Sequence, residues 1–421
     1  MENPPEIVSG AVITSNANQV RVNIRRILLL DCDQFFVQCA RLADPDGAGR
    51  EALLLVGGSV EGRGVVTSAS YETRVFGVRS GMPTGQALRL CPRARVVPVP
   101  RRICGEKSRA VRAVLARFSP VVEAASIDEA YIDLTGTERL YHDEPLEATA
   151  RRIQQAVLAE TEIQTSIGGG TSRLVGKLAV ERAKPAGVHI VAPGAEAVFL
   201  ATFELRDIPG VGPVFAEELR RFGLARVADA QQLPAQTLID LLGDGRGEWL
   251  ARRIRGVDDT PVDGSGHLQK SMSRDETFPR DLHRLSELER ELLVLTTRIG
   301  ADLREAGCRA RTVTVRIRDA DFRTRQASRT LPEPLETDRA IHAVARELLA
   351  RLHGARRIGA RLLGVGASNL VAADGTASQL GLFGGGAQLE SDRDRRRDRA
   401  ADEIRDRFGR GMLKPGRLLG D

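Results

Sequence analysis

The sequence is poor in aromatic residues and cysteines, and it has no long apolar run. Aromatic side chains make up only 4% of the 421 residues. The five cysteines show no CxxC spacing, which argues against a zinc site and against a disulfide framework. No apolar run approaches membrane-spanning length, and the acidic, proline-rich start MENPPE lacks the basic character of a signal peptide. We therefore expect a protein of the reducing cytoplasm with no membrane partner.

The chain does contain enough apolar residues for several cores. They make up 42% of the sequence, and a single core stops growing well before 421 residues, so we expect several domains. The formal net charge of +6 is compatible with a polyanionic partner. A basic but merely solvated surface would give the same charge, so the charge alone does not identify a partner.

Two acidic clusters follow apolar stretches about a hundred residues apart. In RRILLLDCDQFF, the run from Ile27 to Leu30 predicts a strand buried on both faces, which places Asp31 at the rim of a sheet. In SIDEAYIDL, Asp128 and Glu129 are adjacent, so a turn or bulge must redirect one of them before both can reach one ion. Carboxylate oxygens at two strand ends suit Mg²⁺. Either cluster alone is typical of a solvated turn, but together they indicate two-metal phosphoryl or nucleotidyl transfer.

A tyrosine and an arginine in ASYETRVFGVRSG lie three positions apart. If this segment is helical, Tyr71 and Arg74 are neighbours on one face. Such a pair can stack on a base or sugar and grip a triphosphate. A core tyrosine beside a surface arginine is the plainer alternative.

The segment TSRLVGKLAVERAKPAG is only superficially like a phosphate-binding P-loop. The spacing from Gly170 to Gly176 is one residue too long, and Leu178 stands where the motif has Ser or Thr, so we reject that interpretation. A helix that stops before Pro185 is predicted instead. Lys184 at its end is placed to meet a phosphate, although such a lysine often only complements the helix dipole.

The segment 205–224 contains the turn IPGVG and predicts a helix-hairpin-helix. Pro213 is the expected first residue of a helix and Gly223 its stop. The glycines Gly210 and Gly212 would let backbone N–H groups approach a DNA phosphate without reading the base sequence. A plain turn between two helices is the alternative.

Beyond the polar, turn-rich stretch 258–267, which we interpret as a flexible linker, two strands carry regularly spaced arginines. Val313, Val315 and Ile317 alternate with polar residues, which predicts one core face and one basic face. We expect the same basic face on the following strand, and a basic sheet face matches a duplex backbone. A merely solvated face remains the alternative. The arginines assigned to DNA binding are Arg316, Arg318, Arg323 and Arg325.

Near the end of the chain, SQLGLFGGG places apolar residues in glycine-rich sequence. No nearby core would claim them, so they suggest a peptide that docks in a partner's pocket. Its anchors are Gln379, Leu380, Leu382 and Phe383. The charged tail that follows predicts a helix that is exposed or dependent on a partner.

The order of these parts resembles the Y-family translesion DNA polymerases, in the DinB or polymerase IV branch, from about Ile27 to Phe383. The resemblance implies an α+β multidomain, right-hand polymerase with palm, small fingers, helix-hairpin-helix thumb and C-terminal little finger. Its activity would be template-directed addition of dNTPs, with low-fidelity synthesis past damaged bases. The expected limits are a mobile leader at 1–25, palm at 26–36 and 101–191, fingers at 37–100, thumb at 192–262, linker at 263–270, little finger at 271–370 and tail at 371–421.

The resemblance also assigns roles to single residues. It implies that two Mg²⁺ ions are held by Asp31, Asp128, Glu129 and the backbone carbonyl of Cys32. Phe36 falls at the ring that excludes a ribose 2′-OH. The residues expected to contact the incoming dNTP are Phe36, Ser68, Tyr71, Arg74 and Lys184. The implied partners are primer-template DNA, the dNTP and a sliding clamp bound by QLGLF, with the chain acting as a monomer.

The segment RRILLLDCDQFF corresponds to the first motif of this family, in which Cys32 and Gln34 are less usual side chains. Gln34 could alter how the nucleotide pocket is lined. A non-catalytic scaffold of the same fold would keep the hairpin and the clamp peptide but lose carboxylates. This sequence has all three carboxylates, Asp31, Asp128 and Glu129. A nucleotide cyclase would have no use for the hairpin or for arginine-lined strands.

Overall fold

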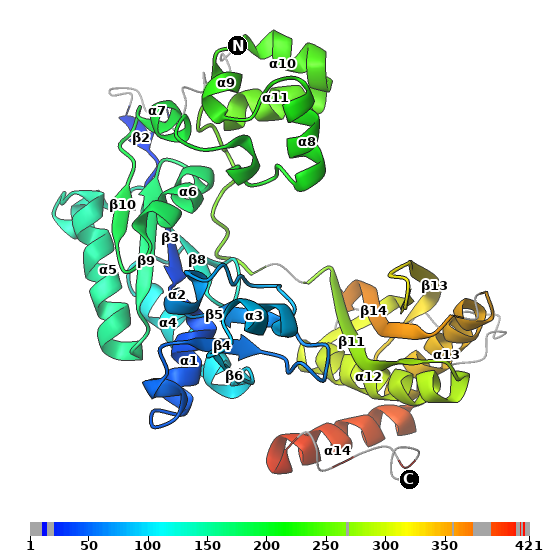
Figure 1. Cartoon of the computed structure of the whole chain (residues 1–421). Helices are drawn as coiled ribbons and strands as arrows, with labels where there is room; N and C mark the ends of the chain where they lie inside the picture. The colour runs from blue at the N-terminus through cyan, green and yellow to red at the C-terminus, as the bar shows by residue number, and fades with distance from the viewer. Residues whose placement is uncertain are drawn as a thin grey trace. The chain divides into compact units, whose positions relative to one another are not determined.

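The computed structural model of this chain describes residues 11–14, 21–266, 269–355, 358–373, 389–409, 413 and 416. The chain divides into two compact units (Figure 1), which contain residues 1–59 with 64–266 and residues 60–63 with 267–421. The main division, after Gly266, falls within the stretch that we expected to be a linker.

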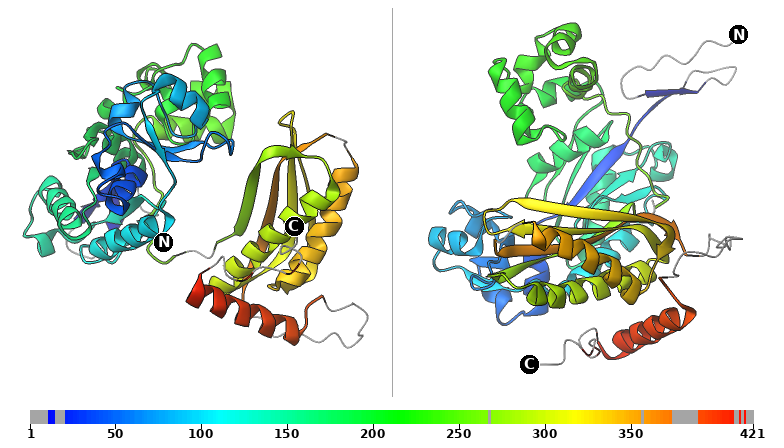
Figure 2. Two further views of the ribbon diagram at one scale, coloured as in Figure 1. Left: turned by 60° about the horizontal axis from the view of Figure 1, so that its bottom comes forward. Right: turned by 90° about the vertical axis from the view of Figure 1, so that its right-hand side faces the viewer.

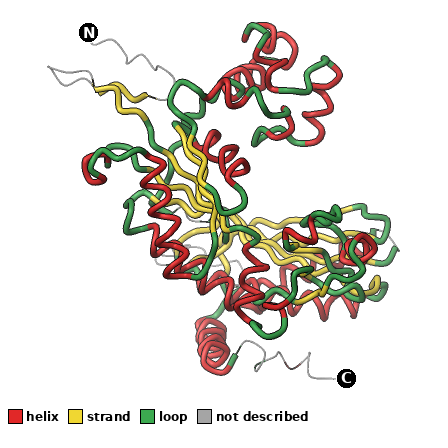
Figure 3. The backbone as a smooth tube through the Cα atoms, turned by 60° about the vertical axis from the view of Figure 1, so that its left-hand side comes forward, coloured by secondary structure: helices red, strands yellow, loops and turns green. Residues whose placement is uncertain are grey.

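The first unit is built around a five-stranded sheet, the palm sheet, with strand order β10-β9-β3-β8-β7. Its strands are β3 (Ile27–Cys32), β7 (Val122–Ala124), β8 (Glu129–Asp133), β9 (Thr165–Gly170) and β10 (Val188–Ile190). Its covering helices are α4 (Arg101–Leu115), α5 (Leu146–Thr161) and α6 (Arg173–Ala183). Leu28 and Leu30 pack with α4 and α5, whereas Ile27 and Leu29 face α6, so β3 is buried on both sides as predicted. The strands of this unit, in yellow, and the helices beside them, in red, can be followed in Figure 3.

A smaller sheet with strand order β5-β4-β6 lies in the segment that we expected to be the fingers. Its strands are β4 (Leu54–Gly57), β5 (Val66–Ala69) and β6 (Arg95–Val97). The helices of this region are α1 (Phe35–Ala43), the 3₁₀ turn η1 (Ala48–Arg50), α2 (Tyr71–Arg74) and α3 (Thr84–Leu90). The first turn of α2 is capped by Ser70, whose hydroxyl accepts the N–H of Thr73. A further 3₁₀ turn, η2 (Glu138–Tyr141), follows the palm strand β8.

The thumb segment folds into short helices around one apolar core. They are α7 (Glu196–Leu200), η3 (Leu205–Asp207), α8 (Pro213–Arg221), α9 (Val227–Gln231), α10 (Ala235–Leu242) and α11 (Asp244–Arg253). Pro213 is the first residue of α8, and Gly223 follows its end with φ of 78°, as the sequence predicts. The helix expected before the hairpin, however, is only the single 3₁₀ turn η3.

The second unit packs two long helices on one face of an antiparallel sheet with order β11-β14-β12-β13 (Figure 2). Its strands are β11 (Ser271–Leu282), β12 (Cys308–Asp319), β13 (Thr324–Leu335) and β14 (Ala360–Ala372). The helices are α12 (Leu285–Glu305) and α13 (Asp338–Gly354). Val313, Val315 and Ile317 of β12 point into this core, which confirms the predicted apolar face.

Two short strands lie inside the segment expected to be a mobile leader. β1 (Ala11–Thr14) pairs antiparallel with β2 (Arg21–Ile24), so these residues form a two-stranded hairpin within that segment. Among the helices of the described ranges, none combines the length and apolar character needed to cross a bilayer.

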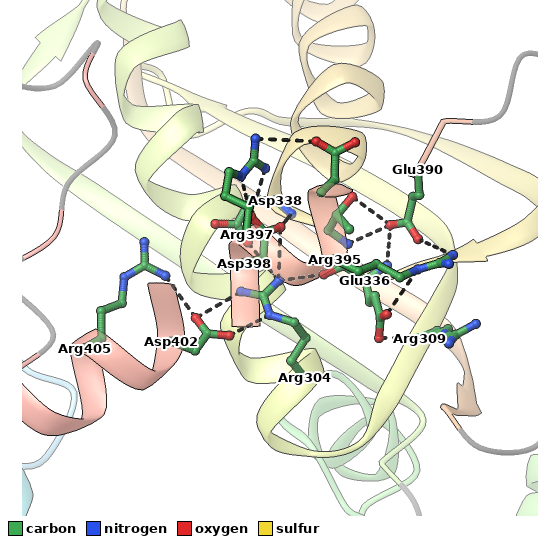
Figure 4. A network of polar contacts seen from close by, with 12 residues as sticks. Arg304, Arg309, Glu336, Asp338, Glu390, Arg395, Arg397, Asp398, Asp402 and Arg405 are labelled. Carbon is green, nitrogen blue, oxygen red and sulfur yellow. Dashed lines mark hydrogen bonds and ion pairs between the residues drawn. The ribbon is translucent and has the colours of Figure 1, made fainter. Parts of the chain in front are cut away.

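The C-terminal helix α14 (Asp392–Phe408) docks on the second unit through charged side chains (Figure 4). Arg304 of α12 has a side chain that is only 7% exposed and lies among three carboxylates. The N–O distances are 3.0 Å to Asp338, 3.7 Å to Asp398 and 2.6 Å to Asp402. The tail is therefore helical, as predicted, but one of its sides faces the protein instead of solvent.

The segment around α14 also caps the N-terminus of α13. The first N–H groups of a helix have no partner within it, and Thr337 makes no side-chain cap. The Glu390 carboxylate accepts the N–H groups of Glu336 and Thr337 at 2.7 and 2.6 Å, and the Asp398 carboxylate accepts that of Asp338 at 2.8 Å. Acidic groups at this helix end also interact favourably with its dipole.

Candidate active site

Strand pairing places Asp31 directly opposite Glu129 at one end of the palm sheet. The register of β3 and β8 aligns these two residues. The N–H of Cys32 donates to the carbonyl oxygen of Asp128 at 2.9 Å, so the turn before β8 lies against the end of β3. The structure therefore brings the backbone of all four predicted metal-site residues to the same sheet end.

The turn between β7 and β8 is organised by Ser126. Its hydroxyl accepts the N–H groups of Asp128 and Glu129 at 3.2 and 3.0 Å and donates to the Asp128 carboxylate. The tight turn that the sequence required between the strands is present. The Asp128 side chain is engaged by Ser126, and across the described residues no three acidic, histidine or cysteine side chains converge on one ion. The place of Asp128 in the predicted set of metal ligands therefore stays a prediction.

Two lysines of the α6 segment neutralise the facing carboxylates. The Lys184 ammonium lies 2.8 Å from Asp31, and the Lys177 ammonium bonds to Glu129. Burial raises the pKa of Asp31 to about 7, although Lys184 opposes this and nearby Glu129 adds to it. Burial alone would also raise the pKa of Glu129, but Lys177, Asp31 and Lys184 together outweigh burial and the net pKa is lowered.

These side chains fit a divalent cation. Two carboxylates supply hard oxygen donors, and their mutual repulsion at a largely buried position calls for positive charge. The lysines provide part of that charge in this structure. Asp31, Glu129 and the carbonyl of Cys32 are the groups that would hold an ion, and Asp128 is the further carboxylate of the predicted set.

Lys177 is a site residue that sequence reasoning missed. It lies seven residues before Lys184, a separation of nearly two helical turns, so both point from the same side of the α6 segment. The seven-residue spacing was the signal that could have identified it.

Tyr71 and Arg74 are neighbours on α2, as the sequence predicts. The Arg74 guanidinium lies over the Tyr71 ring, 4.8 Å from its centroid, and its Nε donates to the carbonyl of Ala69 at 3.0 Å. The Tyr71 hydroxyl donates to Asp33 at 2.9 Å, and its backbone N–H donates to the Gln34 side chain at 3.0 Å. Gln34, the unusual residue of the first motif, thus anchors a residue expected to contact the nucleotide.

The other residues expected around the nucleotide lie on neighbouring elements. Phe36, on the first turn of α1, is partly buried, and its ring meets that of Phe35 edge-on with centroids 5.5 Å apart. Ser68 is buried on β5, with 5% of its surface exposed. The roles of Phe36 and Ser68 in nucleotide binding stay predictions.

The two glycines of the thumb hairpin have different environments. Gly210 has φ of 105°, and a Cβ there would lie 2.6 Å from the Trp249 ring, so a turn and close packing require this glycine. A Cβ at Gly212, the N-cap of α8, would meet no heavy atom within 4 Å. Only Gly212 therefore combines an open backbone with a helix N-terminus.

The predicted basic face of the second unit is only partly correct. Arg316 and Arg318 lie opposite Gln326 and Thr324 and point away from the apolar core. Arg325 lies opposite Ile317, which places it on the core face, and it bonds to Asp319 and to α13.

The assignment of Arg325 to a DNA-facing surface is therefore wrong, because directly opposed residues of an antiparallel pair share a face. Arg323 lies before β13 with a side chain that is 76% exposed. The clamp-binding residues Gln379, Leu380, Leu382 and Phe383 lie outside the described residues.

Comparison with known proteins gives consistent matches. Residues 30–181 match the impB/mucB/samB family, and residues 269–382 match the C-terminal domain of that family. The chain is 35% identical to DNA polymerase IV of Dehalococcoides mccartyi strain CBDB1 over 396 residues, covering 94% of this chain and 98% of that one. It is 35% identical to DNA polymerase IV of Caulobacter vibrioides over 393 residues, covering 93% of each.

Solved structures share the fold. A Y-family DNA polymerase chimera built on Dbh has a TM-score of 0.73 at 24% identity, with coverage of 82% of this chain and 99% of that one. DinB from Sulfolobus solfataricus has a TM-score of 0.55 at 24% identity, with the same coverage.

Proposed function

Because this chain belongs to the DNA polymerase IV branch of the Y-family translesion DNA polymerases, we propose that Asp31, Asp128 and Glu129 form its catalytic metal site. The enzyme is a DNA-directed DNA polymerase, and this family generally needs divalent metal ions. The observation that carries the assignment is the register of Asp31 opposite Glu129, with the Asp128 turn against the same strand end. Two Mg²⁺ ions, with the Cys32 carbonyl as a further ligand, are the cofactor that we propose.

Two such ions, held by Asp31, Asp128 and Glu129, would supply positive charge that activates the primer 3′-OH and offsets the charge of the nucleotide phosphates. The protein's own contribution is positioning and fixed positive charge. Lys184 is held beside Asp31 at 2.8 Å, and we propose that its ammonium group contacts a phosphate of the incoming nucleotide. Arg74, stacked on Tyr71, offers a planar guanidinium for bidentate contact with a phosphate group.

Primer extension on a primed template with dNTPs and Mg²⁺ tests this assignment. Extension by template-matched nucleotides that stops on chelation of the metal supports it. Binding of primer-template without any extension would favour a scaffold of the same fold.

We predict that Phe36→Ala lowers discrimination against ribonucleotides about a hundredfold while DNA synthesis continues. Truncation removes the ring that would meet a ribose 2′-OH, and steric rejection of this kind is lost with the blocking group. The measurement is the ratio of kcat/KM for a dNTP and the matching rNTP. Phe35→Leu, which changes the neighbouring buried ring, should keep the ratio of the unmodified protein. An unchanged ratio in Phe36→Ala would remove Phe36 from this role.

For DNA contacts, we propose the N-terminus of α8 at Gly212 together with the exposed arginines of the second unit. The open backbone at Gly212 is suited to a phosphate. The arginines are Arg316, Arg318 and Arg323. Changing Arg318 to alanine should weaken primer-template binding and make the affinity less dependent on salt. An unaltered salt slope would contradict the contact.

We also propose that Gln379 to Phe383 binds a sliding clamp. Changing Leu382 and Phe383 together to alanine should leave synthesis by the isolated enzyme unchanged but abolish its stimulation by purified clamp, because both apolar anchors are lost. Leu389→Ala, a change just outside the peptide, serves as the control. Equal stimulation of both variants would refute the assignment.

The five cysteines are free and buried, which agrees with a cytoplasmic enzyme, and we propose that it acts as a monomer. Light scattering of the purified protein measures the oligomeric state directly.

A further inference from the structure

A buried carboxylate next to the proposed metal site has no part in the mechanism above. Asp33 is 1% exposed. Its Oδ1 accepts hydrogen bonds from the hydroxyls of Tyr71 and Ser166, each at 2.9 Å. Its Oδ2 accepts from the Ser166 hydroxyl at 3.1 Å and from the N–H of Ala186 at 2.8 Å. One carboxylate therefore joins three separate segments of the chain, namely α2, the palm strand β9 and the loop after α6.

The contacts of Asp33 and its neighbour Gln34 fix Tyr71 at both ends. The hydroxyl of Tyr71 is held by Asp33, and its backbone N–H is held by the side chain of Gln34. Gln34 has φ of 40°, in the left-handed region that a non-glycine residue occupies only where its surroundings determine it. The orientation of the tyrosine ring is thus set by two consecutive residues that directly follow Cys32.

The fixed ring in turn supports Arg74. The guanidinium lies over one face of the ring, and its Nε is bound by the Ala69 carbonyl. A tyrosine hydroxyl has a single proton, so while it donates to Asp33 it cannot also donate to a phosphate oxygen. In this arrangement Tyr71 can act only through its ring, one face of which supports Arg74.

We propose that Asp33 is a positioning residue for the incoming nucleotide. It acts on Arg74 through the ring of Tyr71, and on Lys184 through the N–H of Ala186, two residues further along the same loop. The inference rests on the proposed function, because that function supplies the triphosphate that Arg74 and Lys184 bind. Both carboxylate oxygens of Asp33 accept hydrogen bonds from protein groups, so its loss should weaken nucleotide binding much more than it slows the chemical step.

Single-nucleotide insertion kinetics on a primed template with Mg²⁺ test the proposal in Asp33→Asn, Tyr71→Phe and the double variant. The Ala186 N–H can only donate, so it retains the amide oxygen of the asparagine, and the amide NH₂ then faces the Tyr71 hydroxyl. The charge-assisted acceptor for Tyr71 is lost without a change in side-chain size. We expect each single change to raise the KM for the dNTP about tenfold with kcat within about threefold. The KM of the double variant should be no higher than that of the more impaired single variant, because both changes break the same hydrogen bond.

Ser166→Ala is the matched control. It removes a hydrogen bond to the same carboxylate from the palm side without touching Tyr71, and its KM should stay within about twofold of that of the unmodified protein. Fluorescence anisotropy of labelled primer-template, run on every variant, reports whether the protein still binds DNA.

Several results would overturn the proposal. An unchanged KM for the dNTP in Asp33→Asn would overturn it. A rise in the KM of the double variant equal to the product of the two single rises would also overturn it. A fall in kcat at constant KM would place Asp33 in the chemical step, and loss of primer-template binding would make its role structural. If the unmodified protein itself failed to extend a primer, the proposed function would fall, and this inference with it.

Discussion

Replacing Asp128 by alanine is expected to lower the rate of primer extension about a thousandfold or more while the protein stays folded. Groups that stabilise charge in the transition state typically contribute factors of this order. Asp128 is the cleanest of the three carboxylates to remove, because it is partly exposed and its side chain bonds to Ser126 in a turn. Removal of Asp31 would instead leave the Lys184 ammonium without its buried partner. The measurement is kcat for single-nucleotide insertion on a primed template.

A matched control comes from the same turn. Ser126→Ala removes the hydrogen bonds that organise the turn but keeps all three carboxylates, so its rate should stay within about tenfold of that of the unmodified protein. Both variants should bind primer-template equally well. Full extension by Asp128→Ala would take this carboxylate out of the metal site.

The carboxylate end of the palm sheet could be predicted from the sequence because it depends on local patterns. Four consecutive apolar residues form a strand only where both faces are covered, and Asp31 directly follows them. The adjacency of Asp128 and Glu129 required a turn, and the turn is present. The hydrogen bond of the Asp128 carboxylate was not predictable, because the sequence does not show that the Ser126 hydroxyl donates to it.

Predictions about faces failed where a register was assumed. We assigned Arg325 to the basic face by extending the alternation of β12 to the next strand. On β13, however, Arg325 lies an even number of residues from Ala327 and Leu331, which face the core. The signal was therefore in the sequence, since residues two apart on a strand share a face. A buried ion pair with Asp319 makes this position tolerable for an arginine.

Long-range charge pairing lay beyond any local pattern. The alternating charges of the tail predict a helix, but not which of its sides meets protein. That depends on Arg304, about a hundred residues earlier, which carries the matching charge. Lys177 and Glu129 form a second ion pair of this kind, between residues that are distant in the sequence and meet only in the folded chain.

The second large effect is expected at Arg304. Its guanidinium is nearly buried and is the shared partner of Asp338, Asp398 and Asp402. Arg304→Ala would leave these carboxylates close together without that cation, and breaking a buried pair in this way typically costs about 3–5 kcal/mol. The exposed Ile404 and Phe408 of α14 contribute little apolar burial. We therefore expect α14 to leave the second unit while the rest of that unit stays folded.

Hydrogen exchange measures this directly. Amides 392–408 should lose protection in Arg304→Ala, whereas those of α12 and the sheet should keep it. Arg399→Ala, which removes an exposed arginine of α14 itself, is the control and should leave the exchange pattern unchanged. Equal protection of amides 392–408 in all three proteins would show that α14 is held by something other than its charges.

Acidification should partly restore docking in Arg304→Ala. Burial raises the pKa of Asp338 to about 6 even beside Arg304, with Asp398 adding to the effect. The docked state therefore binds this proton more tightly than an undocked state with an ordinary aspartate pKa near 3.8. Docking is thus favoured as the pH falls through about 6, and loss of the Arg304 charge should move this transition to higher pH. Protection of amides 392–408 in the variant should rise between about pH 7.5 and 5.5. Protection that stays low throughout this range would show that repulsion among these carboxylates is not what releases the helix.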